Sequence, residues 1–452
     1  MDRISAPLAL RRGVHLAFFA VIAVLGLSAR HAGAVPAFAV QVGVPCESCH
    51  IGGFGPQLTP FGREFKMHGY TTRTNSFNLP FSAMAVASYV QTRRDQAEPP
   101  APGYSVSDNS TLDQASLFLA GGLGNHLGAF VQTTYDGVGR SWHWDNLDVR
   151  ATTTATVGGS NLILGLSLNN APSVQEAWNT LPAWRFPYTT SGLQPGPAAS
   201  PLIGSLAQNT LGLTGYVWIN SSLLFEAGGY QSPSSNFLTH MGVDPYDPGN
   251  IAGTAPYLRL AYQKNWGDKN LEVGAFGMWT NLYPARDQTT GFSDHYSDMG
   301  VDATFQYNWP NKSVFTLNTI YTHESQGLDA SQALGLSQNR EDSLNEVRLD
   351  VAYYWRSMIG LTVGGFDTWG STDPVLYGAN RTFTPNSSGL VFQLDGTPFG
   401  AAGSPLGPRF NLRLGIQYFL YTKFDGASSN YDGMGANASD NNTFRLFAWV
   451  AY

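Results

Sequence analysis

The only two cysteines of the chain lie three residues apart, in the run Cys46-Glu47-Ser48-Cys49-His50. This run matches C-x-x-C-H, the attachment pattern of a c-type haem. Each thiol forms a thioether to one vinyl group of the haem, and the adjacent histidine then lies under the iron as its proximal ligand. The run therefore predicts one covalent haem c, bound by Cys46 and Cys49 and ligated by His50.

Two other uses of this cysteine pair fit the sequence less well. A zinc site would need further Cys or His ligands at matching spacing, and the chain has no second C-x-x-C pair. A thioredoxin-type redox pair would need a βαβ context. The residues that follow, over 52–62, are instead rich in glycine and proline.

The haem iron also needs a sixth ligand or an open position. Met67 and His68 follow the attachment run, and Met84 lies further along the chain. A methionine opposite the histidine would raise the reduction potential of the iron, whereas a second histidine is expected to lower it. Met67 is the preferred distal ligand, and His68 is the alternative. Neither residue needs to be a ligand, since Met67 could serve only in packing and His68 could be solvated.

The N-terminus has the features of a secretory signal peptide. Arginines precede an unbroken apolar stretch over 16–27, and the small residues Ala32-Gly33-Ala34 form a cleavage site. We therefore expect residues 1–34 to be removed, so that the mature chain begins at Val35. The alternative is an uncleaved anchor, but the apolar stretch is short for a span of about 20 residues.

The composition excludes several classes of protein. Charged residues make up 13% of the chain, about half the usual share of roughly 25%. Aromatic residues also make up 13%, and this balance argues against disorder. A net charge of −7 without a basic run argues against nucleic acid as a partner. No later apolar run is long enough for a membrane helix, so a membrane-spanning chain must form a β-barrel.

From residue 81 onward, stretches of about ten residues alternate between apolar and polar, as in transmembrane barrel strands. The clearest stretch has Phe410, Leu412, Leu414, Ile416, Tyr418 and Leu420 on one face and Asn411, Arg413, Gly415 and Gln417 on the other. The stretches 301–307 and 346–353 alternate in the same way. A soluble sandwich also alternates, but its strands are shorter and its chain carries more charge.

The connections between these stretches alternate in length, as the periplasmic turns and outer loops of bacterial barrels do. Short turns are expected near 124–125, 158–159, 220–221, 267–268, 310–311 and 356–357. Long loops are expected at 92–110, 136–144, 170–209, 232–254, 281–296, 324–343, 369–386 and 423–441. Tryptophans lie one or two residues before four of the short turns, which predicts an aromatic girdle at the periplasmic edge; they are Trp218, Trp266, Trp309 and Trp355.

The predicted fold is all-β, an antiparallel transmembrane barrel over 81–452 in a bacterial outer membrane, in contact with its lipid. The first strand is expected at 81–91 and the last at 442–452, which ends on the aromatic Tyr452 and resembles the C-terminal signal of outer-membrane proteins. Because both ends should face the periplasm, the strand number must be even. A weak strand at 389–395 brings it to about sixteen, with fourteen or eighteen as alternatives.

Residues 35–80 form the predicted cytochrome c segment. A segment of about 45 residues is near the limit of independent folding, so we expect it to plug the barrel lumen, whose wall would cover the haem. The third outer loop, 170–209, contains Trp178, Trp184, Phe186 and Tyr188. We hypothesise that this loop folds into the lumen and caps the haem; the alternative is a loop packed outside, over the rim.

Over residues 35–70 the chain resembles the start of the fused monohaem cytochrome–porins, the outer-membrane iron oxidases of iron-oxidising bacteria and their relatives. The resemblance rests on the runs Val35-Pro36-Ala37-Phe38-Ala39, Cys46-Glu47-Ser48-Cys49-His50, Leu58-Thr59-Pro60-Phe61-Gly62-Arg63-Glu64-Phe65-Lys66 and Gly69-Tyr70. It implies a haem in or at the mouth of the barrel, Fe(II) oxidised outside, and electrons passed to a periplasmic cytochrome or cupredoxin. It carries over Cys46, Cys49 and His50, but neither the sixth ligand nor the donor.

The expected function is therefore a transmembrane electron conduit, an Fe(II):cytochrome or cupredoxin oxidoreductase. Carboxylates of the outer loops could attract Fe(II), or could simply keep the loops soluble; they are Asp244, Asp247, Glu324, Asp329, Glu341 and Asp342. One alternative is a diffusive porin with an accessory haem. Another is a conduit for a different donor or for the reverse direction. Haem uptake is disfavoured, because a covalently attached haem is not released.

Overall fold

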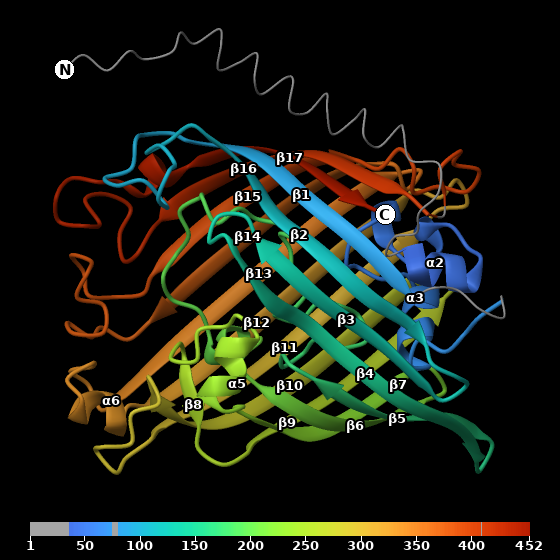
Figure 1. The fold of residues 1–452 in the computed structure, drawn as a ribbon, viewed down its shortest axis with the longest axis horizontal. Coiled ribbons are helices and arrows are strands. Elements are labelled where there is room, and N and C mark those ends of the chain that lie inside the picture. The colour runs from blue at the N-terminus through green and yellow to red at the C-terminus, as the bar shows by residue number, and fades with distance from the viewer. Residues whose placement is uncertain (1–35, 75–79, 408) are drawn as a thin grey trace, which may run out of the picture.

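The computed structural model describes residues 36–74, 80–407 and 409–452, and the predicted signal peptide at 1–34 lies outside them. The chain forms one closed antiparallel β-barrel (Figure 1), in which β17 pairs with β1. The sheet has 17 strand segments. Two of them, β8 and β9, follow each other and both pair with β10, so they form one interrupted strand. The barrel therefore has sixteen strands, as predicted.

The strands are β1 Phe81–Thr92, β2 Asn109–Gly122, β3 Leu127–Asp136, β4 Ser141–Val157, β5 Ser160–Asn169, β6 Leu211–Ile219, β7 Leu223–Gln231, β8 Gly249–Ile251, β9 Ala255–Trp266, β10 Lys269–Pro284, β11 Asp294–Asn308, β12 Val314–Gly327, β13 Glu341–Trp355, β14 Ile359–Gly370, β15 Ser387–Gly396, β16 Asn411–Lys423 and β17 Thr443–Ala451. The short helices are α2 Pro36–Val42, η1 Cys46–Ser48, η2 Ile51–Gly53, α3 Pro60–Met67, α4 Leu202–Ser205, α5 Ser235–His240, α6 Asp329–Ala333 and η3 Ala438–Asn441. The weak strand expected at 389–395 is confirmed as β15.

The apolar side chains of the strands point outward and the polar ones inward, as predicted. On β16, Leu414, Ile416 and Tyr418 are exposed on the outer surface, whereas Arg413 and Gln417 are buried inside. An apolar band around a closed barrel is the surface that faces lipid, so the barrel spans a bacterial outer membrane. Among the helices of the described residues, none is long and apolar enough to cross a membrane.

The two ends of the barrel differ as expected, with two exceptions. The connection predicted as a long loop over 136–144 is wrong, because β3 and β4 continue further and leave only 137–140 between them. At the opposite end, where the other turns are short, β15 and β16 are joined by the long connection 397–410. This connection contacts the N-terminal segment, since the amide of Glu47 donates to the carbonyl of Gly400 at 3.1 Å.

The predicted aromatic girdle is correct at three of its four positions. Trp266 and Trp355 are exposed on the outer surface, and Trp309 packs on the outward Tyr353 at 5.8 Å between ring centroids. The prediction is wrong for Trp218, which is fully buried inside the barrel against Trp178. Its distance from the turn matches that of the others, but it occupies an inward position of β6.

The N-terminal segment lies inside the lumen at the short-turn end, and the haem predicted for it stays a prediction. Figure 1 shows α2 and α3 at the mouth of the barrel opposite α6. Arg63 of α3 is fully buried and donates to the inward amides of Gln263, Asn270 and Gln306. Gly52 has φ +68°, and a Cβ there would lie 2.3 Å from the ring of Tyr354. Residues 36–74 therefore form a fitted plug.

If the outer surface faces lipid, a charge placed there should destabilise the barrel. Leu260 is 53% exposed at the middle of β9. We expect Leu260→Arg to lower the free energy of unfolding from vesicles by about 2–4 kcal/mol, as arginine does near a bilayer midplane. Tyr246→Arg, at a loop residue that is 60% exposed, should change it by less than about 0.5 kcal/mol. Equal effects in urea titrations would contradict the lipid-facing assignment.

Candidate functional site

The two cysteines and His50 form one tight turn of the plug. The amides of Cys49 and His50 both donate to the carbonyl of Cys46, at 3.1 and 2.9 Å. Helix α3 packs directly against this turn, because a Cβ at Gly62 would lie 2.3 Å from the carbonyl oxygen of Cys49. Both thiols are free and buried, and both line the same cavity as His50. The predicted attachment residues are therefore brought together.

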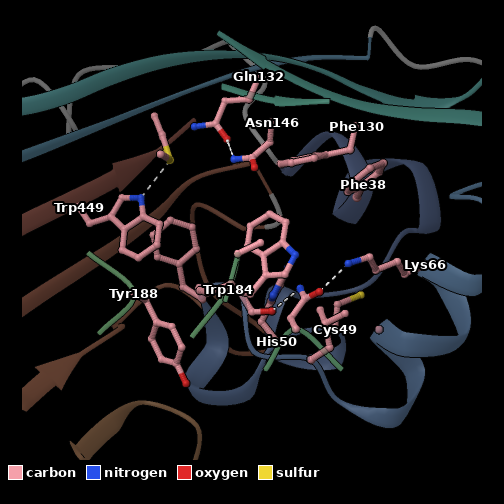
Figure 2. A pocket seen from close by; sticks show the side chains of 18 of the residues that line it. Phe38, Cys49, His50, Lys66, Phe130, Gln132, Asn146, Trp184, Tyr188 and Trp449 are labelled. Carbon is pink, nitrogen blue, oxygen red and sulfur yellow. Dashed lines mark hydrogen bonds between the residues drawn. The ribbon is translucent and has the colours of Figure 1, made fainter. Parts of the chain in front are cut away.

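The cavity lies between the plug, the inner wall of the barrel and the loop 170–209. Its volume is about 540 Å³, within the range of roughly 300–1,000 Å³ that is usual for ligand and cofactor sites. Figure 2 shows Phe38, Phe130, Trp184, Tyr188 and Trp449 around it. A cavity lined mainly by aromatic and apolar side chains, with polar and charged groups among them, suits a flat macrocycle that carries polar substituents.

Burial sets the protonation state of the predicted attachment residues. Burial, helped by the positive charge of Arg413, lowers the pKa of His50 to about 4, so the imidazole is neutral. Neutral imidazole is the form that ligates metals, and its buried Nδ1 has no hydrogen-bond partner. Burial, with the neighbouring Cys46, raises the pKa of Cys49 to about 12. The residues of this site thus fit a haem c.

The proposed distal ligands lie elsewhere. Met67 packs against Trp218 on the far side of α3, with its sulfur 3.6 Å from Nη1 of Arg150. His68 is partly exposed, and its Nδ1 hydrogen-bonds the carbonyl of Glu64 at 2.9 Å. Neither residue lines the cavity, whereas Met84 does.

Met84 was the third candidate in the sequence. The indole Nε1 of Trp449 donates to its sulfur at 3.2 Å. Met84 lies on β1, so the inner wall of the barrel supplies it, not the plug. Its distance along the chain from the attachment run is why sequence spacing ranked it last. The distal ligand itself stays a prediction.

The loop 170–209 folds into the lumen, so the alternative of a loop over the rim is wrong. Trp184 and Tyr188 line the cavity. Lys66 of the plug donates from Nζ to the carbonyl of Val174 at 2.8 Å and to the side chain of Asn179 at 2.5 Å. The loop therefore packs on the plug and closes the cavity from the side of the outer loops.

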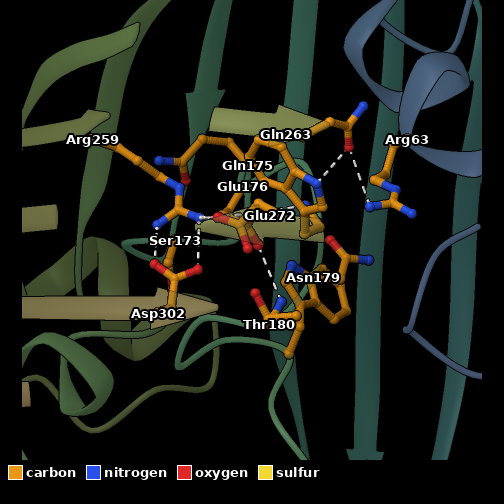
Figure 3. A network of polar contacts seen from close by, with 12 residues as sticks. Arg63, Ser173, Gln175, Glu176, Asn179, Thr180, Arg259, Gln263, Glu272 and Asp302 are labelled. Atoms are coloured by element: carbon orange, nitrogen blue, oxygen red, sulfur yellow. Dashed lines mark hydrogen bonds and ion pairs between the residues drawn. The ribbon is translucent and has the colours of Figure 1, made fainter. Parts of the chain in front are cut away.

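A buried ion cluster anchors this loop to the barrel wall (Figure 3). Arg259 of β9 contacts Glu176 of the loop at 3.3 Å, Glu272 at 3.2 Å and Asp302 at 2.8 Å, and all four side chains are fully buried. Trp178 lies with its ring centroid 5.5 Å from the guanidinium. Sequence reasoning missed this cluster, because its partners are far apart in the chain. The one signal in the sequence was the inward position of the charged Arg259 on β9.

The outer carboxylates do not gather into one site. Glu324 lies inside the barrel and accepts from the amide of Leu202 at 2.5 Å, and Asp329 pairs with Arg340. Asp244 and Asp247 are exposed on a different loop. Within the described part of the chain, no three His, Cys, Asp or Glu side chains are arranged to hold a metal ion.

No protein-family model and no curated protein matches the chain. Among solved structures, the chain is similar to OprB of Pseudomonas putida, with 13% identity, 90% of this chain and 99% of that chain covered, and a TM-score of 0.49. OmpT of Vibrio cholerae has 9% identity, with 84% and 100% covered and a TM-score of 0.45. An anion-selective porin from Comamonas acidovorans has 11% identity, with 82% and 98% covered and a TM-score of 0.44. Such identities indicate no more than a barrel fold, which the strand pairing establishes by itself.

The anchor of the loop can be tested with one substitution and a matched control. Glu176 accepts from Arg259 and from the amides of Trp178 and Thr180, at 2.7 and 3.1 Å from the two amides. Removing such charged hydrogen bonds costs about 1.5–3 kcal/mol each. We therefore expect Glu176→Gln to loosen the loop and to increase open events in planar-bilayer recordings.

The control is Glu272→Gln, which also removes a partner of Arg259, whereas the hydrogen bond of Glu272 to Arg259 joins two strands of the wall and not the loop. It should leave the open events at the wild-type frequency. Equal increases for both variants would show that the charge balance of Arg259, rather than the loop anchor, keeps the lumen closed.

Proposed function

We propose that the protein carries electrons across the outer membrane through one haem c bound in the plug. The donor is extracellular Fe(II), and the acceptor is a periplasmic cytochrome or cupredoxin. The observation that supports this most is that Cys46, Cys49 and His50 line one cavity inside the lumen whose other walls are largely aromatic. When bound there, the haem supplies a one-electron iron couple. Electron transfer of this kind needs no acid–base residue.

Because the cavity lies within the lumen, a single haem bound there would shorten the distance that electrons must cross. The apolar band of such a barrel is about 25 Å tall. A haem outside the lumen would leave this whole distance to be crossed, whereas the plug holds the cavity inside the wall. Trp184 and Tyr188 close the cavity toward the outer loops.

The filled lumen favours a conduit over a pore. Arg63 hydrogen-bonds side chains of three strands and so fixes the plug to the wall. Lys66 and Arg259 bind the loop 170–209, which extends into the lumen. Exposed outer-loop carboxylates such as Asp244, Asp247 and Glu341 would raise the local concentration of Fe(II). Outer loops of the opposite charge would have disfavoured a cationic donor.

A diffusive porin with an accessory haem is the second candidate, because the barrel has the strand number of diffusive porins. The porin and the conduit differ in the ion conductance that they predict. The porin would conduct ions steadily with haem bound, whereas the conduit stays closed. A conduit for another donor, or for electrons flowing outward, would share the closed lumen and would differ only in the reaction with Fe(II).

Stopped-flow absorbance of the purified, haem-loaded protein tests the donor. Mixed with Fe(II) at acid and at neutral pH, the wild-type haem should be reduced rapidly. His50→Ala should lose this reaction, because the iron loses its proximal ligand. The control is His126→Ala, at an exposed histidine of the turn between β2 and β3, which should react like the wild type. A haem that dithionite reduces but Fe(II) does not would contradict Fe(II) as the donor.

A further inference from the structure

Two arginines give the cavity a cationic corner. Arg185 of the loop 170–209 and Arg348 of β13 both line the cavity, and both contact the buried carboxylate of Glu346. Nη2 of Arg348 lies 2.8 Å from one oxygen of Glu346, and Arg185 donates to the other. Nε of Arg348 is buried without a partner. Two guanidinium groups thus share one carboxylate and keep a surplus of positive charge.

The other charged groups that line the cavity do not remove this surplus. Lys66 is held by neutral oxygens, and Asp145 accepts from Thr134 at 2.7 Å and from Gln208 at 3.1 Å. Lining and supporting groups therefore comprise three cations, at 66, 185 and 348, against two carboxylates, at 145 and 346. Carboxylate groups of a ligand at the corner would offset this surplus, since charge held away from water is costly unless it is paired.

The corner and the cysteines lie at opposite sides of the cavity. Tyr354 of β13 packs on Gly52, next to the attachment turn. Arg348 precedes Tyr354 by six positions on the same strand (354 minus 348), which is about 20 Å of extended chain at roughly 3.3 Å per residue. Because β13 runs from the long loops toward the short turns, the corner faces the outer side and the thiols face the periplasmic side.

We propose that Arg185 and Arg348 bind the propionate carboxylates of the haem c, an inference that rests on the proposed function. The vinyl-derived thioethers and the propionates lie on opposite edges of the macrocycle, as the thiols and the arginines lie on opposite sides of the cavity. Arginine pairs with carboxylates through two parallel hydrogen bonds, which also fix orientation. A haem held in this way would have its propionates at the arginines, toward the outer loops, and its thioethers at the cysteines, toward the periplasm.

This pairing has a signature in the reduction potential. An ionised propionate stabilises Fe(III), so the potential falls as pH rises through the propionate pKa. Paired arginines lower that pKa below the ordinary carboxyl range of about 4–5, and the potential should then stay constant between about pH 4 and 6. Burial lowers the pKa of Lys66 to about 7, outside this window, and Asp145, a carboxylate that also lines the cavity, is unchanged in every variant compared.

Spectroscopic redox titrations of the haem-loaded protein between about pH 4 and 6 provide the test. Arg348→Gln and Arg185→Gln should each lower the potential and introduce a fall with rising pH. Arg348→Lys, which keeps the charge, should restore most of the flat profile. Glu346→Gln should raise the potential and keep it flat. Arg340→Gln, at an exposed arginine paired with Asp329, should change neither property.

Opposite shifts for Arg348→Gln and Glu346→Gln are required, because a merely structural role of the corner would move both in the same direction. A flat profile in both arginine variants with normal haem content would overturn the inference and leave the proposed function standing. A wild-type potential that moves with added acetate would assign the corner to a soluble anion and overturn it as well. A chain without covalent haem would overturn the proposed function first.

Discussion

The structure depends on satisfying the polar inner wall of a lumen that the plug and the loop 170–209 enter. Buried charges are tolerated only when they are paired and hydrogen-bonded. Arg150 of β4 shows how this is done. It pairs with Asp148 at 2.8 Å and donates to the carbonyls of Lys66 in the plug and Gln175 in the loop 170–209. One fully buried side chain therefore joins wall, plug and loop.

This arrangement explains how a cavity large enough for the proposed cofactor can form around a short segment. The plug supplies the attachment turn, but much of the cavity wall comes from β1 to β4, β13 and β17 and from the loop. Phe38 stacks on Tyr70 within the plug at 5.0 Å between centroids, and also contacts Phe130 of β3 at 6.3 Å. The apolar core of the plug is thus continuous with the barrel wall. A cofactor site of this kind exists only in the assembled barrel.

Much of the fold could be predicted because its signals are local. Alternation with period two and the spacing of turn residues place a strand without knowledge of its neighbours, and the parity of the strand number recovered β15. The failure at Trp218 has a definite cause. Distance from a turn does not tell which face a residue occupies, whereas the shared parity with the buried Thr214 and Tyr216 on β6 does.

The candidate site was predictable only in part. The predicted attachment residues lie within one short run, Cys46 to His50, so their spacing alone was enough to predict a haem site. Met84 and Arg348 reach the cavity from distant strands, and no sequence spacing relates them to the attachment turn. Met67 is adjacent in sequence, but the helical geometry of α3 turns it toward the barrel wall. Proximity along the chain therefore indicates the predicted attachment residues and not the residues that complete the cavity.

The central claim is that electrons cross the membrane through a closed barrel. Sealed vesicles that contain the haem-loaded protein and an enclosed ferricytochrome test it directly, with Fe(II) added outside. The account predicts reduction of the enclosed acceptor without entry of iron, and no reduction when the protein carries Cys46→Ser and Cys49→Ser and therefore no attached haem. Reduction that requires iron to enter, or that persists in the double variant, would contradict the account and indicate a diffusive pore.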